Sequence, residues 1–465
     1  MVLRKSSAIE IPESERNTFW VSQILNQLTR TQRRFDNPDI VDTLIFYECR
    51  NGIIKIPRLF KIINSDIQYD TCVTDGEHID IDFKAELRNE LQRESVKYLC
   101  THDDGILKLN PGEGKTVISI ASICEMKKKA IIFVHKDSLV TQWRERFLQF
   151  STIKDEDIGI LETSKYLDII KKPIVIGTVQ TMGNMIKKYP MLQSDFYKAN
   201  FGIGIWDECH TTGGAQLFSR SIYYIPARKC FGLSATPGRA DHNDDITGMH
   251  LGKVYEPEGV SDTLKPRVVM TYFDTGVMQK FAYYINYGFP NKNGERQKFP
   301  LFDKNRYLTM LNSKKLTTYV RTLHKIIDVL YKKGRNILTL VDRLKLIDSI
   351  SKGFPQEDVG YFLPRTGKER DNQLKRKLVF STPGSARDGT DNPTLDCLVL
   401  ATPVGNLDQA IGRVCRKKEG KPVPIVIDIV DSGCKDMVKK AEYRKNYCLE
   451  KVKKNGWTFE EKFLK

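Results

Sequence analysis

Residues 107–116 read LKLNPGEGKT and lead into a short apolar stretch, 117–123, that has the pattern of a helix. Two glycines let backbone N–H groups turn around an anion, and the helix start adds its positive dipole end. The lysine that follows would reach the β and γ phosphates of ATP, and the threonine hydroxyl would bind Mg²⁺. The residues that this loop offers to the nucleotide are Gly112, Glu113, Gly114, Lys115 and Thr116. The alternative is a glycine turn that caps an ordinary helix, because Leu109 stands where the general pattern has its first glycine.

Two neighbouring acids follow a second apolar run. Asp207 and Glu208 come directly after 201–206, which has the pattern of a buried strand. Ligands of open α/β sheets bind at the carboxyl ends of the strands, so both acids would face the phosphate loop. We expect Asp207 to hold Mg²⁺ and Glu208 to orient and deprotonate the attacking water. A solvated pair of acids at a strand end is the alternative.

Length, charge and cysteine pattern limit the class of protein. The chain has 465 residues, with 74 Lys and Arg against 58 Asp and Glu, a net charge of +16. This size predicts two or three cores, and the basic balance predicts a polyanionic partner. No apolar run reaches the ~18 residues of a membrane span, and no signal peptide is apparent after Met1. The ten cysteines are scattered singly, which argues against zinc ribbons and disulfides and favours the cytoplasm, of a host cell if the chain is viral.

Short apolar runs alternate with amphipathic helices along two stretches of the chain, which is the pattern of parallel sheets built from βαβ units. The expected strands are 131–134, 174–176, 202–206 and 229–233 in the first stretch, and 336–341, 377–381, 397–400 and 424–429 in the second. We therefore predict an α/β protein with two tandem lobes, each a parallel sheet flanked by helices. The expected domains are an α+β accessory domain for DNA recognition at 1–84, a first lobe at 85–268, an insertion at 269–310, a second lobe at 311–432 and a basic helical tail at 433–465.

Four motifs occur in an order that resembles the superfamily 2 helicases. They are GEGKT at 112–116, DECH at 207–210, SATP at 234–237 and QAIGRVCR at 409–416. The longer string GLSATPGRAD at 232–241 is similar to the branch of XPB, type III restriction enzymes and phage UvsW, in which an Arg-x-Asp pair follows SAT. The resemblance implies two RecA-like lobes that bind and hydrolyse ATP with Mg²⁺.

The resemblance also implies roles for single residues. Gln92 would contact the adenine base. The residues that match the family's motifs V and VI are Gly389, Asp391, Gln409, Arg413 and Arg416. The two arginines lie three residues apart, so on a helix they would share a face and approach the γ-phosphate as arginine fingers.

Contacts with a nucleic-acid strand are expected in the first lobe and in the insertion. The candidates are Lys136, Thr178, Arg239, Tyr284 and Phe289. A helix N-cap at Thr178 and a solvated side chain at Lys136 are equally open alternatives. The insertion 269–310 mixes aromatic residues with cations, which suits stacking on unpaired bases and a hairpin that wedges a fork open. A loop whose aromatic residues pack against a lobe is the alternative.

These patterns predict an ATP-dependent DNA helicase or translocase that unwinds or branch-migrates forked and junction DNA in replication, recombination or repair. The compact size and small leading domain look most like the tailed-phage branch-migration helicases. We expect it to act as a monomer with ATP and Mg²⁺, away from membranes. The alternatives are the motor of a restriction system, an RNA helicase, and a non-catalytic nucleic-acid-binding or transcription factor, which the presence of the ATP-site residues disfavours.

Overall fold

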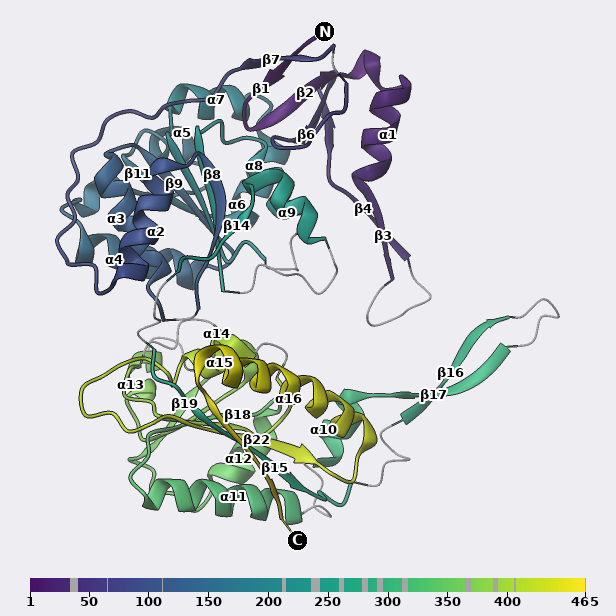
Figure 1. The fold of residues 1–465 in the computed structure, drawn as a ribbon, viewed down its shortest axis with the longest axis vertical. Helices are drawn as coiled ribbons and strands as arrows, with labels where there is room; N and C mark the ends of the chain where they lie inside the picture. The colour runs from purple at the N-terminus through teal and green to yellow at the C-terminus, as the bar shows by residue number, and fades with distance from the viewer. Residues whose placement is uncertain are drawn as a thin grey trace. The chain divides into compact units, whose positions relative to one another are not determined.

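The structure, a computed structural model, divides into two compact units, residues 1–261 and 262–465 (Figure 1). It describes residues 1–33, 41–64, 66–110, 112–210, 215–235, 243–258, 263–277, 283–290, 296–311, 317–363, 366, 369–387, 392–404 and 407–464. Within these residues, every helix is too short or too polar to cross a bilayer.

Seven parallel strands form the large sheet of the first unit, in the order β10-β11-β9-β12-β13-β8-β14. They are β8 (Asp104–Lys108), β9 (Ala130–Val134), β10 (Ile158–Ile160), β11 (Ile174–Thr178), β12 (Ile203–Asp207), β13 (Lys229–Ser234) and β14 (Val254–Tyr255). All five residues of β9 are buried, as expected of a strand that is covered on both faces.

Helices cover both faces of this sheet and create two cores. One core lies under α2 (Glu90–Thr101), α3 (Lys115–Met126) and α4 (Asp137–Phe150). The other lies under α5 (Tyr166–Ile169), α6 (Val179–Lys188), α7 (Leu192–Ala199), α8 (Ala215–Ile222) and α9 (Asp244–Leu251). A 3₁₀ turn, η2 (Asp155–Asp157), precedes β10. The apolar runs predicted as strands 131–134, 174–176, 202–206 and 229–233 correspond to β9, β11, β12 and β13.

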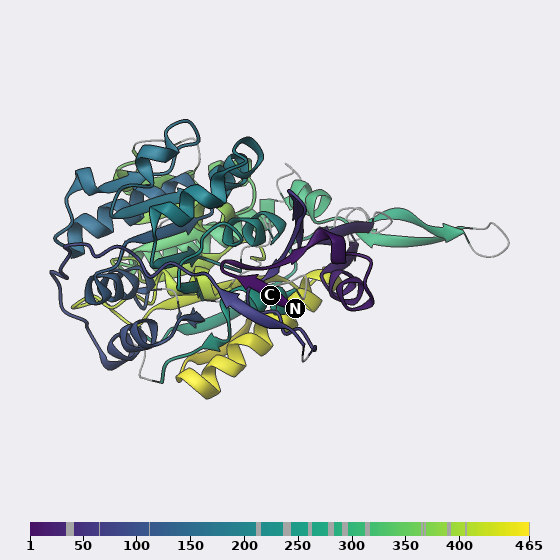
Figure 2. The same cartoon turned by 90° about the horizontal axis from the view of Figure 1, so that it is seen from above.

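The N-terminal residues form a smaller mixed sheet within the same unit, in the order β5-β6-β2-β1-β7, beside a separate ribbon of β3 and β4 (Figure 2). The elements are β1 (Val2–Lys5), β2 (Ala8–Pro12), η1 (Glu13–Glu15), α1 (Phe19–Gln27), β3 (Thr29–Arg33), β4 (Val41–Ile45), β5 (Glu48–Arg50), β6 (Ile53–Pro57) and β7 (Gln68–Thr71). The buried guanidinium of Arg58 donates to the carbonyl oxygens of Ala227 at 3.2 Å and Arg228 at 3.1 Å. Ile246 of α9 also joins the core of this small domain, so the domain is docked on the first lobe.

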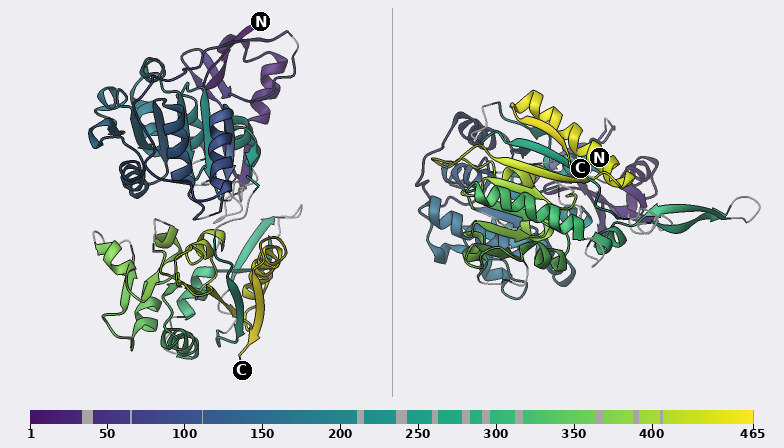
Figure 3. Two further views of the ribbon diagram at one scale, coloured as in Figure 1. Left: turned by 60° about the vertical axis from the view of Figure 1, so that its left-hand side comes forward. Right: turned by 90° about the horizontal axis from the view of Figure 1, so that it is seen from below.

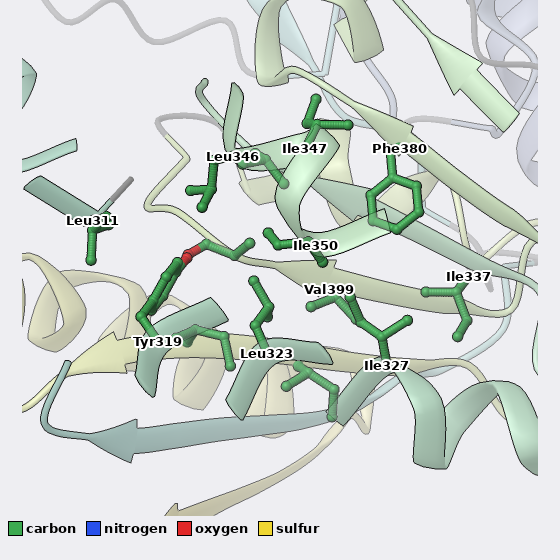
Figure 4. Close-up of a cluster of buried hydrophobic side chains, with 14 of the residues drawn as sticks. Leu311, Tyr319, Leu323, Ile327, Ile337, Leu346, Ile347, Ile350, Phe380 and Val399 are labelled. Carbon is green, nitrogen blue, oxygen red and sulfur yellow. The ribbon is translucent and has the colours of Figure 1, made fainter. Parts of the chain in front are cut away.

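The second unit has its own seven-stranded parallel sheet, in the order β19-β20-β18-β21-β22-β15-β23 (Figure 3). The strands are β15 (Arg267–Phe273), β18 (Ile337–Leu340), β19 (Val359–Phe362), β20 (Leu378–Ser381), β21 (Cys397–Leu400), β22 (Ile425–Asp431) and β23 (Thr458–Phe463). One face packs on α11 (Thr317–Lys332) and α12 (Leu344–Ser351), and Figure 4 shows this core, with Leu323 and Ile327 beside Ile350. The other face packs on α13 (Arg370–Leu374), α14 (Pro383–Arg387), α15 (Leu407–Gly412) and the C-terminal part of α16 (Lys435–Asn455).

The insertion contains an antiparallel hairpin of β16 (Tyr283–Pro290) and β17 (Arg296–Phe302), followed by α10 (Lys304–Leu311). The two strands form a sheet of their own. In the ribbon views the hairpin extends away from the helices and the large sheet of its unit (Figures 1 and 2).

The predicted fold class is confirmed, because each unit is built on a parallel sheet flanked by helices and a small α+β domain precedes them. Two strands differ from the expected division of the chain. β15 begins at 267, inside the range expected for the first lobe, and pairs with β22 and β23 of the second sheet. The apolar run of β15 fits a buried strand of either sheet, so only its pairing shows which sheet it belongs to. The range 433–465 adds β23 to the expected helix.

Candidate active site

The carboxyl ends of three strands bring the motifs of the first unit to one edge of its sheet. Leu107 of β8 pairs with Leu233 of β13, and Leu233 pairs with Asp207 of β12. Just beyond these pairs, the N–H of Leu109 donates to the carbonyl oxygen of Ser234 at 3.1 Å. The phosphate loop, the two acids and the SAT motif therefore start from neighbouring positions.

The phosphate loop has the backbone of an anion cradle. Gly112 and Gly114 have φ angles of 91° and 92°, in the left-handed region, and α3 begins at Lys115. The φ angle of Gly114 favours glycine, and a Cβ atom there would also lie 2.6 Å from Nε2 of Gln92, whose side chain would have to move. The Lys115 ammonium donates to the carbonyl oxygen of Leu109 across the loop, at 3.0 Å.

Glu113 braces this loop from inside. Its side chain is buried, and its Oε2 accepts from the backbone N–H of Asn110 at 2.6 Å. Its Oε1 accepts from the Asn110 side-chain amide at 3.0 Å. Both oxygens are thus engaged within the loop, which lowers the repulsion that a free carboxylate would exert on bound phosphates.

Gln92 lies behind the loop. Its side chain is fully buried, with Nε2 donating to the carbonyl oxygen of Glu113 at 2.8 Å and Oε1 accepting from the N–H of Arg88 at 2.9 Å. The resemblance implied a contact with adenine, whereas in this structure the amide holds the phosphate loop. The guanidinium of Arg88 lies on the exposed side of the loop, 3.3 Å from the carbonyl oxygen of Gly112.

Asp207, the predicted Mg²⁺ ligand, is held in place by two donors. Its Oδ2 accepts from the indole Nε1 of Trp143 at 2.9 Å, and its Oδ1 accepts from the N–H of Glu208 at 2.9 Å. Burial, and then the charge of Glu208, raise the pKa of Asp207 to about 6, while Trp143 and the Lys115 ammonium limit the rise. A carboxylate here and the hydroxyl of Thr116, in the first turn of α3, are hard oxygen ligands of the kind that Mg²⁺ prefers.

Glu208, the predicted general base, has an unusual backbone and a polar neighbour. Its φ angle is 50°, in the left-handed region, which is uncommon for a residue other than glycine. Its Oε2 lies 3.3 Å from Nδ1 of His210, and the same nitrogen is hydrogen-bonded to Oγ of Ser234 at 2.7 Å. His210 is therefore hydrogen-bonded to the SAT motif and lies close to the carboxylate of Glu208.

Two strand-contact candidates of the first unit are described. The hydroxyl of Thr178 accepts from the N–H of Thr181 at 3.1 Å, so the side chain caps α6, as the alternative stated. Lys136 is half-buried at the N-cap of α4. Arg239 lies outside the described residues. Tyr284 and Phe289 belong to β16, and at these two positions the structure describes the backbone only.

The second unit places three motif VI residues around the end of α15. Gln409 lies within the helix, which ends at Gly412, so Arg413 follows it in a turn and Arg416 lies outside the helix. The two arginines therefore do not share a helical face as expected. Beyond the helix, Val414 and Cys415 are buried in the core of this unit. Gly389 and Asp391 lie outside the described residues.

Sequence reasoning missed the roles of two side chains at this edge. Trp143 donates to the predicted metal ligand, and His210 joins Glu208 to Ser234. His210 belongs to the DECH motif and Trp143 lies outside the quoted motifs, and an indole or imidazole nitrogen carries no local signal of its partner. The available signal was position, since His210 lies two residues after Glu208.

Comparisons with known proteins agree with the motifs. Residues 84–239 match the family described as the type III restriction enzyme, res subunit. A protein of Acanthamoeba polyphaga mimivirus, named as a candidate ATP-dependent RNA helicase, is 28% identical over 81% of this chain and 70% of its own length. The helicase/translocase subunit XPB of the general transcription and DNA repair factor IIH of Schizosaccharomyces pombe is 25% identical over 68% of this chain and 39% of its own length.

A solved structure shows the same fold. The ATP-dependent type ISP restriction-modification enzyme LlaBIII bound to DNA has a TM-score of 0.54 and 17% identity, over 82% of this chain and 31% of that one. The family match spans the phosphate loop, the acids and the SAT motif, and the two relatives extend the likeness across more than one lobe. Residues 84–239 therefore match the type III restriction enzyme family, the chain is similar to superfamily 2 helicases of the XPB branch, and it is a nucleic-acid-binding enzyme that hydrolyses ATP.

Proposed function

We propose that this chain is a DNA motor that uses ATP hydrolysis to unwind or branch-migrate forked and junction DNA, and that it works as a monomer. The observation that carries the proposal is the contact chain from Glu208 through His210 to Ser234. These contacts connect Glu208, the residue expected to activate water, with the SAT motif. A change at the phosphates therefore has a short path out of the hydrolysis site. The relative named as a DNA repair translocase supports DNA as the track.

The first lobe supplies most of the proposed hydrolysis chemistry. Backbone N–H groups of the phosphate loop bind the phosphates, and Lys115 leaves the carbonyl of Leu109 to neutralise them. Asp207 and Thr116 hold Mg²⁺, which supplies charge neutralisation on the β and γ oxygens when it is bound. Glu208 orients the attacking water and takes its proton.

The second lobe supplies the remaining contacts in this proposal. Arg413 and Arg416 stabilise the charge that develops on the γ-phosphate, with Gln409 beside them, and such a finger is worth about 10³ to 10⁵ in rate. Gly389 and Asp391 of motif V contribute further nucleotide contacts. Because the arginines and the phosphate loop belong to different lobes, their meeting would depend on closure around ATP and end when the γ-phosphate leaves.

The hairpin of β16 and β17 is the proposed wedge. Tyr284 and Phe289 stack on unpaired bases, each contact contributing ~1 to 3 kcal/mol, while Lys136, Thr178 and Arg239 contact the backbone of the strand. Repeated closure and opening of the lobes would then move the strand past the hairpin. A basic chain with a net charge of +16 favours such contacts.

The proposal is tested by comparing a DNA fork, a four-way DNA junction, a plain DNA duplex and an RNA fork of the same sequence. We expect DNA-stimulated ATP hydrolysis, and unwinding of the fork and the junction but not of the RNA. Glu208→Gln should lower ATP hydrolysis by about 10² to 10⁴ and still bind DNA, since it removes only the general base. Glu145→Gln, on the exposed side of α4, is the matched control.

Two results would change the assignment. Equal unwinding of RNA and DNA forks would make the chain an RNA helicase, as the name of the mimivirus relative suggests. ATP hydrolysis that DNA and RNA leave unchanged would overturn the motor proposal.

A further inference from the structure

Asp431, the last residue of β22, receives hydrogen bonds from both ends of the insertion. From the segment that leaves β15, the Oγ1 and N–H of Thr275 donate to Asp431 Oδ2 and Oδ1, at 2.6 and 3.3 Å. From α10, which follows the hairpin, the Tyr307 hydroxyl donates to Oδ2 at 2.8 Å. The N–H of Gly433 donates to Oδ1 at 3.0 Å. One carboxylate thus holds the chain before and after the hairpin.

This arrangement favours a group that accepts at both of its oxygens, as a carboxylate does. Four donors converge on the two oxygens, and the side chains of Asp431, Thr275 and Tyr307 are buried. Burial, and then the charge of Asp431, raise the pKa of Tyr307, so its hydroxyl remains protonated and donates. An asparagine in place of Asp431 would have the same shape but would turn an NH₂ group toward at least one donor.

The base of the hairpin is anchored a second time on α16. The hydroxyl of Tyr283, the first residue of β16, donates to Oδ2 of Asp436 in the first turn of that helix. Its ring packs edge-on against Phe302, the last residue of β17, with ring centroids 5.6 Å apart. The Lys440 ammonium lies 5.1 Å from the centroid of the Phe302 ring, and Arg306 donates to the carbonyl oxygen of Tyr283 at 3.3 Å.

A third anchor connects α10 with the loop that follows β18. Lys304 forms an ion pair with Asp342 at 2.6 Å, and the Arg343 guanidinium donates to Oδ1 of Asn305 at 2.8 Å. The two ends of the insertion are therefore connected to the ends of β15, β18 and β22. Contacts that span three strands restrict hinge motion at the base more than a single tether would.

We propose that Asp431 is the positioning residue of the wedge, clamping both ends of the insertion to β22 so that the hairpin moves with the second lobe as a rigid arm. This inference rests on the unwinding function proposed above for the hairpin. A rigid arm transmits the displacement of the lobe to the base pairs at a fork, whereas a hairpin on a loose tether lets the displacement dissipate.

The test compares Asp431→Asn with wild-type protein in three measurements: amide hydrogen exchange in 274–277 and 303–311, DNA-stimulated ATP hydrolysis, and unwinding of a DNA fork. We expect exchange in both segments to rise about tenfold to a hundredfold, because buried donors lose their acceptor. Unwinding should fall about tenfold while ATP hydrolysis stays within about twofold, since the nucleotide residues are untouched. Asp328→Asn, on α11 and paired there with Lys332, is the matched control and should change none of the three.

Each of the remaining outcomes contradicts one part of the inference. Unchanged exchange in Asp431→Asn would overturn the clamp. Faster exchange with wild-type unwinding would overturn the rigid arm and leave the helicase function standing. Wild-type protein that hydrolyses ATP without opening a fork would overturn the proposed function, while exchange would still decide the clamp. If Asp431→Asn loses its cooperative thermal transition, Thr275→Val and Tyr307→Phe, which each remove side-chain donation to Asp431, should show the same split between unwinding and hydrolysis at smaller size.

Discussion

Asp207 and Asp431 each end a strand at the carboxyl edge of a parallel sheet, yet the two lobes use them differently. Asp431 accepts four hydrogen bonds that fix the path of the chain. Asp207 accepts two from the described residues and lies beside a second acid, which helps to raise its pKa to about 6. A carboxylate with acceptor capacity left can bind a metal or water, whereas a saturated one can only hold structure.

The two lobes also differ in the cations that lie near their buried carboxylates. In the first lobe a cation, Lys115, limits the rise in the pKa of Asp207 without an ion pair in this structure, because its ammonium donates to a carbonyl instead. In the second lobe the buried Asp428 has a two-bond partner in Arg444, at 2.7 and 3.1 Å. Position at a sheet edge therefore does not separate a chemical carboxylate from a structural one. Saturation of both oxygens by donors, as at Asp431, or a bound guanidinium, as at Asp428, marks the structural ones.

The largest effect that tests this contrast is expected for Asp207→Asn. Loss of the charge that holds the metal should lower ATP hydrolysis by about 10³, with DNA binding retained. The fold should also respond to pH in a new way. A raised pKa means that wild-type protein loses stability as pH rises from 3.8 toward about 6, and the variant should lack this decline.

Thermal unfolding at several pH values and steady-state ATP hydrolysis check this prediction. Asp195→Asn, on α7 of the same lobe and hydrogen-bonded to Tyr166, is the control for the loss of a carboxylate away from the site. Hydrolysis within tenfold of wild type would contradict the chemical role assigned to Asp207.

The next largest effect is expected for Arg444→Met in the second lobe. Asp428 would then be buried without its partner, which should cost ~3 to 5 kcal/mol of unfolding free energy. Burial already raises the pKa of Asp428 although Arg444 opposes it, and removal of the arginine should raise it further. A raised carboxyl pKa destabilises the fold at the higher pH, so the loss in Tm should be larger at pH 8 than at pH 4.

Thermal unfolding of the double variant Arg444→Met with Asp428→Leu provides the control. Because apolar residues of similar size often replace a buried pair without loss, the double variant should recover most of the Tm. A double variant as unstable as the single one would show that the arginine acts through packing rather than through charge.

Much of the fold could be predicted because strands that are buried on both faces read as continuous apolar runs. The sequence also predicted the strand, loop and helix around Lys115 and the acid at the end of β12, because both patterns depend on local spacing. The placement of β15 could not be predicted, because its pairing with β22 and β23 depends on segments more than 150 residues away.

Contacts between distant segments were the other limit. Trp143 reaches Asp207 across 64 positions of sequence, and Asp431 reaches Thr275 across 156. The hydrogen bond from the Gln92 amide to the carbonyl of Glu113 was not foreseen, and the adenine contact implied by resemblance stays a prediction. Arg413 and Arg416 were expected on one helix, but α15 ends at Gly412, before both of them.

The smallest effect is expected for Trp143→Phe, which keeps a ring and removes one hydrogen bond to Asp207. This bond limits the rise in the pKa of Asp207, so without it the pKa should rise above about 6. The acid limb of the pH–rate profile of ATP hydrolysis should then move to higher pH by about one unit. The free energy of about one hydrogen bond corresponds to a pKa shift of this size. Hydrolysis should fall about twofold at pH 7 and about fivefold at pH 6, and it should recover at alkaline pH as Asp207 ionises again.

Trp206→Phe is the matched control for this last prediction. Trp206 is equally buried on β12, but its indole donates to Ser221 Oγ at 3.0 Å and packs in the core under α6 and α8. Its loss should lower Tm and leave the acid limb of hydrolysis in place. If Trp143→Phe also lowered Tm and left the acid limb in place, Trp143 would be a packing residue. The difference between Asp207 and Asp431 would then depend only on the burial of Asp207 and on the charge of Glu208.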